Sequence, residues 1–94
     1  MNIKDDIKDL KITCNHMASC LPNTKFIETK KGGLFVNGKR KIGVYVDPTI
    51  NYKYEESFKI RKLKYGFGLR VHPSLTASYH DMKKSVKKGL GIRD

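Results

Sequence analysis

Cys14, His16 and Cys20 lie close together in the sequence, and thiols and imidazoles are the side chains that most often bind zinc. The apolar residues around them recur at helical spacing, so all three belong to one predicted helix. Successive residues of a helix are rotated by about 100°, which places His16 and Cys20 roughly 40° apart and Cys14 on nearly the opposite side. Three ligands in that arrangement do not converge on one ion. We therefore predict no metal site and no cofactor, with Cys14 in the core and Cys20 as a half-buried thiol.

His72, His80 and Asp81, together with the hydroxyl groups between residues 74 and 79, are the residue types of a hydrolytic triad. Neighbouring residues on a helix point in different directions, however, whereas the members of a triad converge from separate segments. The chain also has no Gly-x-Ser-x-Gly turn to present a nucleophile. We predict that the protein is not an enzyme. A small basic nuclease that uses one histidine, His72 before His80, is left as an open alternative.

Cations interleaved with tyrosines form the strongest chemical pattern of the chain. Cations neutralise phosphates, and the face of a tyrosine ring stacks on unpaired bases. Arginine in place of lysine adds bidentate recognition of phosphate or guanine. The plain alternative is that lysines on strands protect the sheet edges from aggregation. The predicted binding residues are Lys39, Arg40, Lys41, Lys53, Tyr54, Lys59, Arg61, Lys62, Lys64, Arg70, Lys84, Lys87 and Lys88.

The overall charge agrees with an anionic partner. The 94 residues contain 20 Lys and Arg against 9 Asp and Glu, a formal net charge of +11. Residues 1–23 are neutral in total, so residues 24–94 carry the whole excess. Such a balance favours a nucleic acid or an acidic protein surface, and it does not separate DNA from RNA. No apolar run has the length of a membrane span or of a signal peptide, so we expect a cytoplasmic protein with free thiols and no membrane partner.

Two amphipathic helices are predicted to support these residues. The first covers residues 3–21, and Pro22 ends it because the residue before a proline is driven out of the helical region. The second covers residues 74–88, with Ser74 as its N-cap and lysines near its C-terminus, where they suit the helix dipole. Their predicted apolar stripes are Ile3, Ile7, Leu10, Cys14, Met17 and Leu21 in the first, and Leu75, Tyr79, Met82 and Val86 in the second.

A sheet is predicted between the helices, over residues 25–72. Its strands lie at residues 25–30, in a hairpin over 33–46, and at 57–63 and 67–72. This predicts one α+β domain over residues 1–94 in the order α-β-β-β-β-α, with a four-stranded antiparallel sheet and both helices on one face. The hairpin is the element around which the other strands are arranged.

The register of that hairpin is ambiguous in the sequence. Asn-Gly is the dipeptide that most readily forms a tight turn, but a turn centred on it pairs apolar residues with lysines. A longer loop over residues 37–41 pairs Val36 with Ile42 and Leu34 with Val44. We predict the longer loop, because one buried face determines register more strongly than the turn dipeptide does.

The function predicted from these features is non-catalytic binding of a nucleic acid through the hairpin tip, the third strand region and the second helix. The alternative is a small inhibitor of the phage or mobile-element type that docks on an acidic or nucleic-acid-handling protein complex. A continuous stripe of cations favours the first, and an exposed apolar centre within the basic patch favours the second. The oligomeric state is left open.

Overall fold

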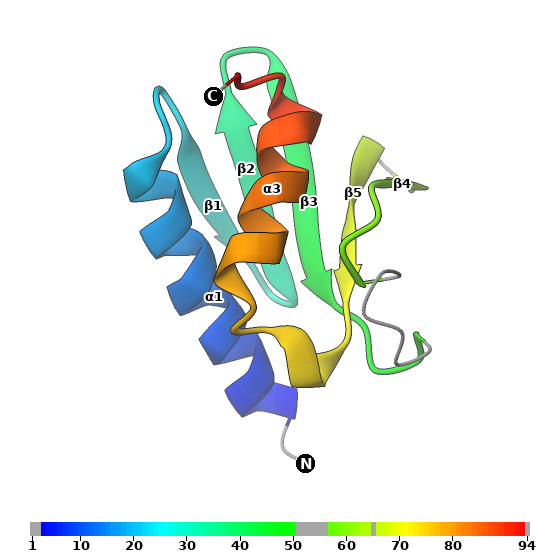
Figure 1. Cartoon of the computed structure of the whole chain (residues 1–94). Helices are drawn as coiled ribbons and strands as arrows, with labels where there is room; N and C mark the ends of the chain where they lie inside the picture. The colour runs from blue at the N-terminus through cyan, green and yellow to red at the C-terminus, as the bar shows by residue number, and fades with distance from the viewer. Residues whose placement is uncertain (1–2, 51–56, 65, 94) are drawn as a thin grey trace.

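The computed structural model of the chain describes residues 3–50, 57–64 and 66–93. Two helices lie against one sheet (Figure 1). The elements in chain order are α1 (Ile3–Cys20), β1 (Lys25–Thr29), β2 (Gly32–Asn37), β3 (Arg40–Val46), β4 (Arg61–Leu63), β5 (Gly66–Val71), a short 3-10 helix (Pro73–Leu75) and α3 (Tyr79–Leu90).

Helix α1 forms as its apolar spacing predicts. Leu10, Cys14 and Met17 are fully buried along one stripe, and two aspartates occupy the first turn, where the helix dipole favours negative charge. The helix ends at Cys20, two residues before Pro22. The sequence prediction for this element is therefore confirmed to within one residue.

The sheet has five strands in the order β1-β2-β3-β5-β4, and it is mixed. Neighbouring strands pair antiparallel except β3 and β5, which are parallel. The predicted four-stranded antiparallel sheet was therefore wrong. A parallel pair needs a long connection that carries the chain back to the starting end of the sheet, and β3 and β5 are separated in the sequence by a segment that contains β4. The backbone N–H of Asp47 donates to the carbonyl of Val71 (2.9 Å), which holds the ends of the parallel pair together.

The predicted hairpin register was also wrong. Asn37 pairs with Arg40, so the turn consists of Gly38 and Lys39, and Gly38 takes the positive φ of 61° that such a turn needs. Asn37 remains in the strand because its side-chain amide donates to the carbonyl of Pro22 (2.9 Å) and to Oγ1 of Thr24 (3.1 Å).

This register decides which hairpin residues enter the core. Phe35 pairs with Ile42 on the buried face, and Val44 lies opposite Gly33. Leu34 and Val36, which were predicted to face the core, therefore point to the other side of the sheet.

The second helix begins later than predicted. Residues 73–75 form a separate 3-10 turn, in which Nδ1 of His72 accepts the N–H of Ser74 (3.1 Å). Helix α3 then starts at Tyr79, with Ser78 as its N-cap, so the predicted capping role of Ser74 was wrong. The short turn uses the backbone donors that a continuous helix from residue 74 would need.

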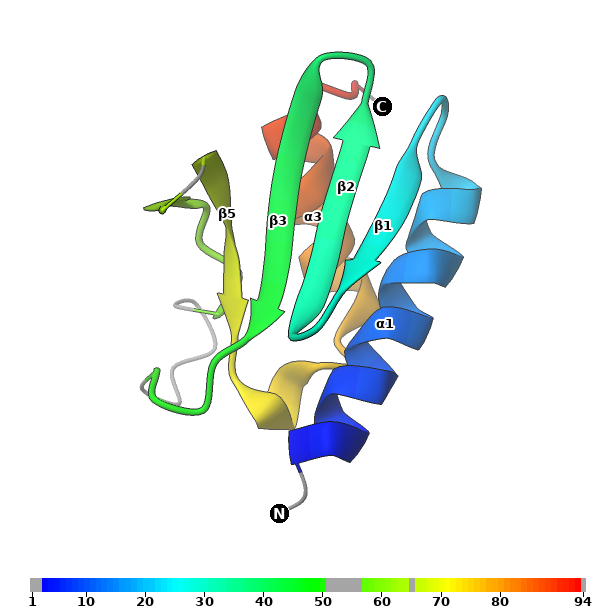
Figure 2. The ribbon, with the colours of Figure 1, turned by 180° about the vertical axis from the view of Figure 1, so that it is seen from behind.

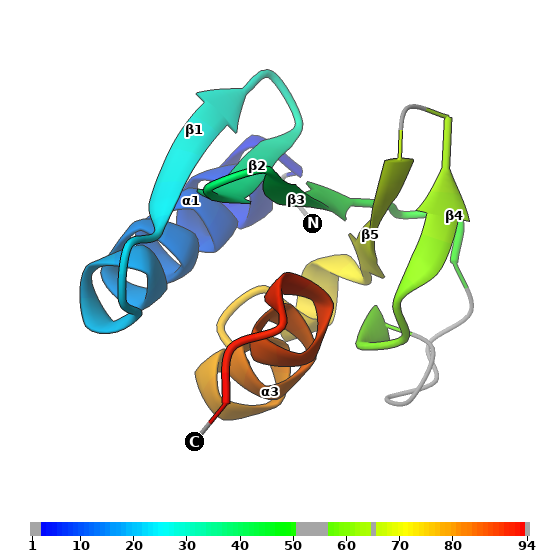
Figure 3. The ribbon, with the colours of Figure 1, turned by 90° about the horizontal axis from the view of Figure 1, so that it is seen from above.

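Both helices cover the same face of the sheet, as predicted, and Figure 3 shows them side by side below the strands. One hydrophobic core lies between the sheet and the two helices. It consists of Phe35, Ile42, Val44, Leu69 and Val71 from the sheet, Leu10, Cys14 and Met17 from α1, and Met82, Val86 and Leu90 from α3. The result is a compact α+β domain. None of the helices among residues 3–50, 57–64 and 66–93 combines the length and the apolar character that crossing a membrane requires.

Candidate functional site

The face of the sheet that α1 and α3 do not cover is the open face. Figure 2 shows it from behind, with β1, β2 and β3 in front of α3. Successive side chains of a strand point to opposite faces, and directly paired residues point to the same face. Because Phe35, Ile42 and Val44 enter the core, their sequence neighbours belong to the open face.

Three transverse rows of side chains make up this face. The first row, nearest the hairpin turn, is Lys25, Val36 and Lys41. The second is Ile27, Leu34, Gly43, Gly68 and Arg61, and the third is Thr29, Gly32, Tyr45 and Arg70. Cations thus lie toward the ends of the rows, with apolar residues and glycines between them.

A hollow of about 740 Å³ lies on the open face over β3 and β5. Leu34, Tyr45 and Leu63 are its main apolar residues. Beneath them, Gly43 and Gly68 are neighbours in the parallel pair. A Cβ on Gly43 would lie 2.6 Å from Cε2 of Tyr45, and one on Gly68 would lie 2.7 Å from Cδ1 of Leu63. The two glycines therefore give the tyrosine ring and the leucine room to lie down on the sheet.

Cations surround the hollow. Lys31, Lys41, Lys64 and Arg70 line it, and among its described lining residues Asp47 is the one carboxylate. Oδ1 of Asp47 accepts hydrogen bonds from the backbone N–H (2.9 Å) and the hydroxyl (2.6 Å) of Thr49. The Thr49 hydroxyl first, and then its N–H and the nearby Arg70, hold the pKa of Asp47 below its ordinary value against the opposing effect of partial burial.

The three predicted cations of the hairpin tip are divided between the faces. Lys41 belongs to the open face and lines the hollow. Arg40 lies on the helix side, where a Cβ on Gly91 would come within 2.2 Å of its Nη1 atom. Its guanidinium therefore rests against the C-terminal end of α3. Lys39 is exposed in the turn between them.

The other predicted binding residues also separate into two groups. Arg61, Lys64 and Arg70 belong to the open face or its hollow. Lys62 pairs with Phe67 on the side of the helices. Lys84, Lys87 and Lys88 line a shallow depression of about 510 Å³ along α3, together with His80 and Lys83. Lys59 is exposed just before β4, and Lys53 and Tyr54 lie outside the described residues. The described cations of this set thus do not form one continuous stripe, and their role in binding stays a prediction.

Several residues of the open face were not among the predicted site residues: Lys25, Ile27, Lys31, Leu34 and Tyr45. Glycines inside a strand pattern often indicate close approach of another group, and Gly43 and Gly68 are such a signal. The signal could have pointed to Tyr45, two residues after Gly43. The signal was incomplete because the predicted antiparallel sheet did not contain the parallel pair of β3 and β5, which places Gly68 beside Gly43.

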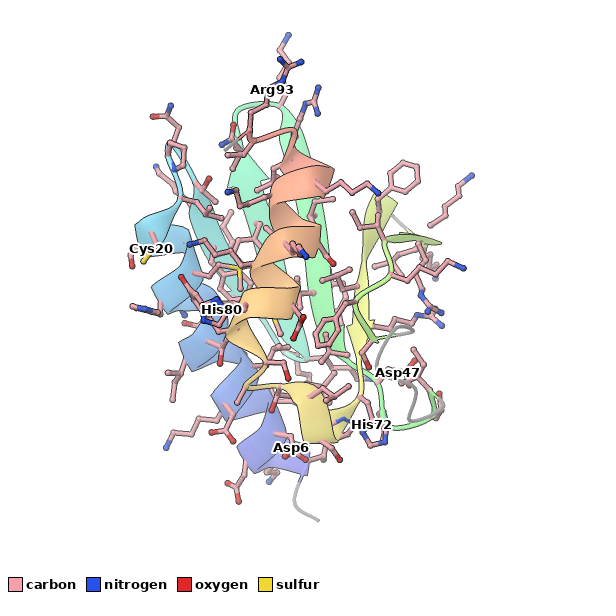
Figure 4. All side chains as sticks on the ribbon, in the orientation of Figure 1. Asp6, Cys20, Asp47, His72, His80 and Arg93 are labelled. Atoms are coloured by element: carbon pink, nitrogen blue, oxygen red, sulfur yellow. The ribbon has the colours of Figure 1, made fainter. Side chains whose placement is uncertain are left out.

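Three of the candidate metal and catalytic residues, Cys20, His72 and His80, are labelled in Figure 4 and lie apart from one another. Cys14 is fully buried, with its Sγ 3.7 Å from Sδ of Met82, which confirms its predicted place in the core. Cys20 is exposed rather than half-buried. His16 packs against the ring of Tyr79, with centroids 5.3 Å apart. The described residues contain no group of three or more His, Cys, Asp or Glu side chains arranged to hold a metal ion.

The hydrogen bonds of His72 fix the local backbone before the 3-10 helix. The ring Nδ1 of His72 accepts a hydrogen bond from the backbone N–H of Ser74. The backbone N–H of His72 donates to Oγ of Ser57 (3.0 Å), and Ser57 is fully buried. Figure 4 shows His72 and Asp47 toward the same end of the sheet, with His80 well away on α3. The nuclease alternative needs only one histidine, and His80 lines the depression along α3 together with Asp81 and lysines, so this alternative stays a prediction.

Comparisons of the chain with protein-family models, with curated proteins and with solved structures found no match.

Proposed function

We propose that this protein is a non-catalytic nucleic-acid-binding protein that engages its ligand with the open face of the sheet. The described cations form no stripe over the whole molecule, so the observation that carries the proposal is a local one: in the hollow, Lys31, Lys41, Lys64 and Arg70 surround an apolar floor that includes a tyrosine ring. Phosphates are neutralised by such cations, while apolar and aromatic side chains contact sugars and bases. The localisation that goes with this function is the cytoplasm.

The open face is preferred to the lysine-bearing surface of α3 for a physical reason. Exposed lysines on a helix are common on soluble proteins, and Ile92 is the one aliphatic side chain among the described residues that line the depression along them. The open face combines charge with apolar surface that no described element covers, and Ile27 on its edge is 54% exposed. Apolar surface left in water is costly unless a partner covers it.

Matched double substitutions test this assignment. Lys31→Gln with Lys41→Gln removes two exposed cations from the open face, and Lys84→Gln with Lys88→Gln removes two from α3. Fluorescence anisotropy with labelled single- and double-stranded DNA and RNA at several salt concentrations measures affinity and its salt dependence. We expect the open-face pair to lower the slope of log K against log salt by roughly 1.4 on a single strand, at about 0.7 for each phosphate contact.

The α3 pair is the control, because it changes the net charge of the protein by the same amount. Its slope should stay close to that of the wild type. Equal losses in both variants would show that net charge alone drives binding. Absence of binding at low salt in the wild type would reject nucleic acid as the ligand.

A second candidate function is supported by a different observation on the same face. Ile27, Leu34 and Val36 form an apolar strip on β1 and β2, next to the cations. Protein interfaces gain most of their affinity from such anchors within a polar rim. This candidate is the predicted inhibitor or interaction protein that docks on an acidic protein.

The test of this candidate uses two exposed isoleucines. Ile27→Glu should abolish capture of an acidic partner in a pull-down. Ile12→Glu, at a position that is 60% exposed on α1, should leave capture intact. The same loss in both variants would rule out a specific role of the apolar strip.

A further inference from the structure

We propose that the open face selects single-stranded over double-stranded nucleic acid, with one unpaired base stacked on the ring of Tyr45 above Gly43. This inference deepens the proposed function and rests on it. It assigns single-stranded nucleic acid to the hollow as its ligand, and base stacking to Tyr45, a residue that the pattern of charges in the sequence does not identify.

The position of the Tyr45 ring carries the first step. If Gly43 had a Cβ, that atom would lie 2.6 Å from Cε2, 3.1 Å from the hydroxyl oxygen and 3.2 Å from Cζ of Tyr45. The outer half of the ring therefore occupies the space above the glycine, and the ring lies along the sheet instead of standing away from it. Tyr45 is half-buried and its strand neighbours Val44 and Val46 are anchored in the core, so the ring is supported from below.

The second step is the shape of the surface around the ring. The hollow measures about 740 Å³, within the range of pockets that enclose a small organic ligand and large enough for a nucleotide. Leu63 lies over Gly68 in the neighbouring strand, and Leu34 flanks Gly43 on the other side. A flat base on Tyr45 would therefore contact apolar side chains at its edges.

The third step is the distribution of charge around this platform. Arg70 pairs directly with Tyr45 across the parallel strands, and Lys41 lies two residues before Gly43 on the same face. Lys31 and Lys64 line the hollow at other points. Phosphates on both sides of a stacked nucleotide thus have cations within the same hollow, opposed by Asp47, the one carboxylate among the described residues that line it.

These three features favour a single strand. Bases in a duplex are stacked on one another and present only their edges in the grooves, so their faces are closed to a tyrosine. Reading a duplex usually requires a protruding helix or ribbon that enters a groove, whereas this face offers a hollow. An unpaired base can leave its neighbours and stack on an aromatic ring.

The test combines three forms of the protein with three forms of the ligand. The proteins are the wild type, Tyr45→Phe, which keeps the ring, and Tyr45→Leu, which keeps an apolar side chain without a ring. The ligands are a short single strand, its duplex and a single strand of equal length with abasic sites, which keeps the phosphates and lacks bases. We expect Tyr45→Leu to weaken single-strand binding roughly ten- to hundredfold and Tyr45→Phe to retain it.

The abasic ligand isolates the stacking contact from the phosphate contacts. The wild type should lose affinity for it by a similar factor, and Tyr45→Leu should bind the intact and abasic strands alike. In an amide NMR spectrum, the signals of Gly43 and Gly68 should shift on binding, while those of Gly89 and Gly91 at the α3 end should not. Thermal unfolding of each variant establishes that it is folded.

The outcomes separate this inference from the proposed function. A wild type that binds duplex as tightly as single strand, or a folded Tyr45→Leu variant with unchanged affinity, overturns the stacking role and leaves nucleic-acid binding standing. Failure of the wild type to bind any of the three ligands overturns both. Shifts confined to Gly89 and Gly91 overturn the assignment to the open face.

Discussion

Nη1 of Arg70 lies 3.8 Å from Oδ2 of Asp47 at the edge of the hollow. The pair is partly exposed, with about half of the arginine side chain open to solvent, so it contributes little to stability by itself. Its importance is that the one described carboxylate lining the hollow is directed at one of the cations proposed to bind phosphate. A phosphate of the proposed ligand would therefore compete with Asp47 for the same guanidinium.

Replacing Asp47 with asparagine should tighten binding of a single strand. Asparagine retains an oxygen that accepts the hydrogen bonds of Thr49, but it removes the negative charge that opposes the ligand. We expect roughly two- to fivefold higher affinity at low salt, and less at high salt. Asp9→Asn on the exposed side of α1 is the matched control. An equal gain in that variant would mean that net charge, and not the position of Asp47, is responsible.

The same carboxylate predicts a dependence of stability on pH. Its pKa in the folded protein is lowered, mainly by the hydroxyl of Thr49. A lowered pKa stabilises the folded state above the unfolded value of about 3.9, and this contribution is lost as the pH falls through the folded value. The urea midpoint of the wild type should therefore exceed that of Asp47→Asn at neutral pH and converge on it in acid. A difference that stays constant down to low pH would contradict the assignment.

Arg40 and Lys41 should respond differently to alanine substitution, although they are adjacent in sequence. Arg40→Ala removes a cation from the C-terminal end of α3, where such a charge stabilises a helix by about 0.3–1 kcal/mol, so stability should fall and affinity should change little. Lys41→Ala removes a cation from the hollow, so affinity should fall severalfold at unchanged stability. Thermal unfolding and anisotropy measure the two effects. Reversal of this pattern would contradict the division of the hairpin tip between two faces.

Gly43→Ala and Gly68→Ala should also differ, although each adds one methyl group to the same row. The methyl group at Gly43 meets the far end of the Tyr45 side chain, which can move, so the ring is displaced and single-strand affinity falls with little loss of stability. The methyl group at Gly68 would lie 2.2 Å from the backbone oxygen of Gly43, and backbone cannot yield in the same way. We expect Gly68→Ala to destabilise the fold by about 1–3 kcal/mol. Similar unfolding midpoints in the two variants would contradict this account.

The two thiols should react with iodoacetamide at very different rates. Burial raises the pKa of Cys14 to about 12, so its reactive thiolate is scarce and inaccessible. The pKa of the exposed Cys20 is lowered, first by the Tyr79 hydroxyl, then by Ser19 and the charge of Lys83. Mass spectrometry should show Cys20 modified first at neutral pH and Cys14 only on unfolding. Tyr79→Phe should move the pH midpoint of Cys20 alkylation upward, and an unchanged midpoint would exclude the role of that hydroxyl.

The parts of the fold that depend on short stretches of chain were predictable. The helix at the N-terminus, its end before Pro22 and the strand after it follow from local spacing and backbone preference. The start of the second helix was not, because the hydrogen bond from the Ser74 N–H to His72 favours a separate turn over the cap that the residue types suggested. The competing structures there differ by one or two hydrogen bonds, which residue preference does not resolve.

The sequence by itself determined that the chain is an α+β protein with two helices on one face of a sheet, whereas the anionic partner that its charge suggests stays a prediction. Only the tertiary structure decided which cations share a surface. Register and the parallel pairing of β3 with β5 depend on contacts between residues far apart in the chain, and a shift by one residue moves every side chain of a strand to the opposite face. That is why Arg40 lies against α3 while Lys41 lines the hollow, and why Tyr45 becomes visible as a candidate site residue only once Gly43 and Gly68 are neighbours.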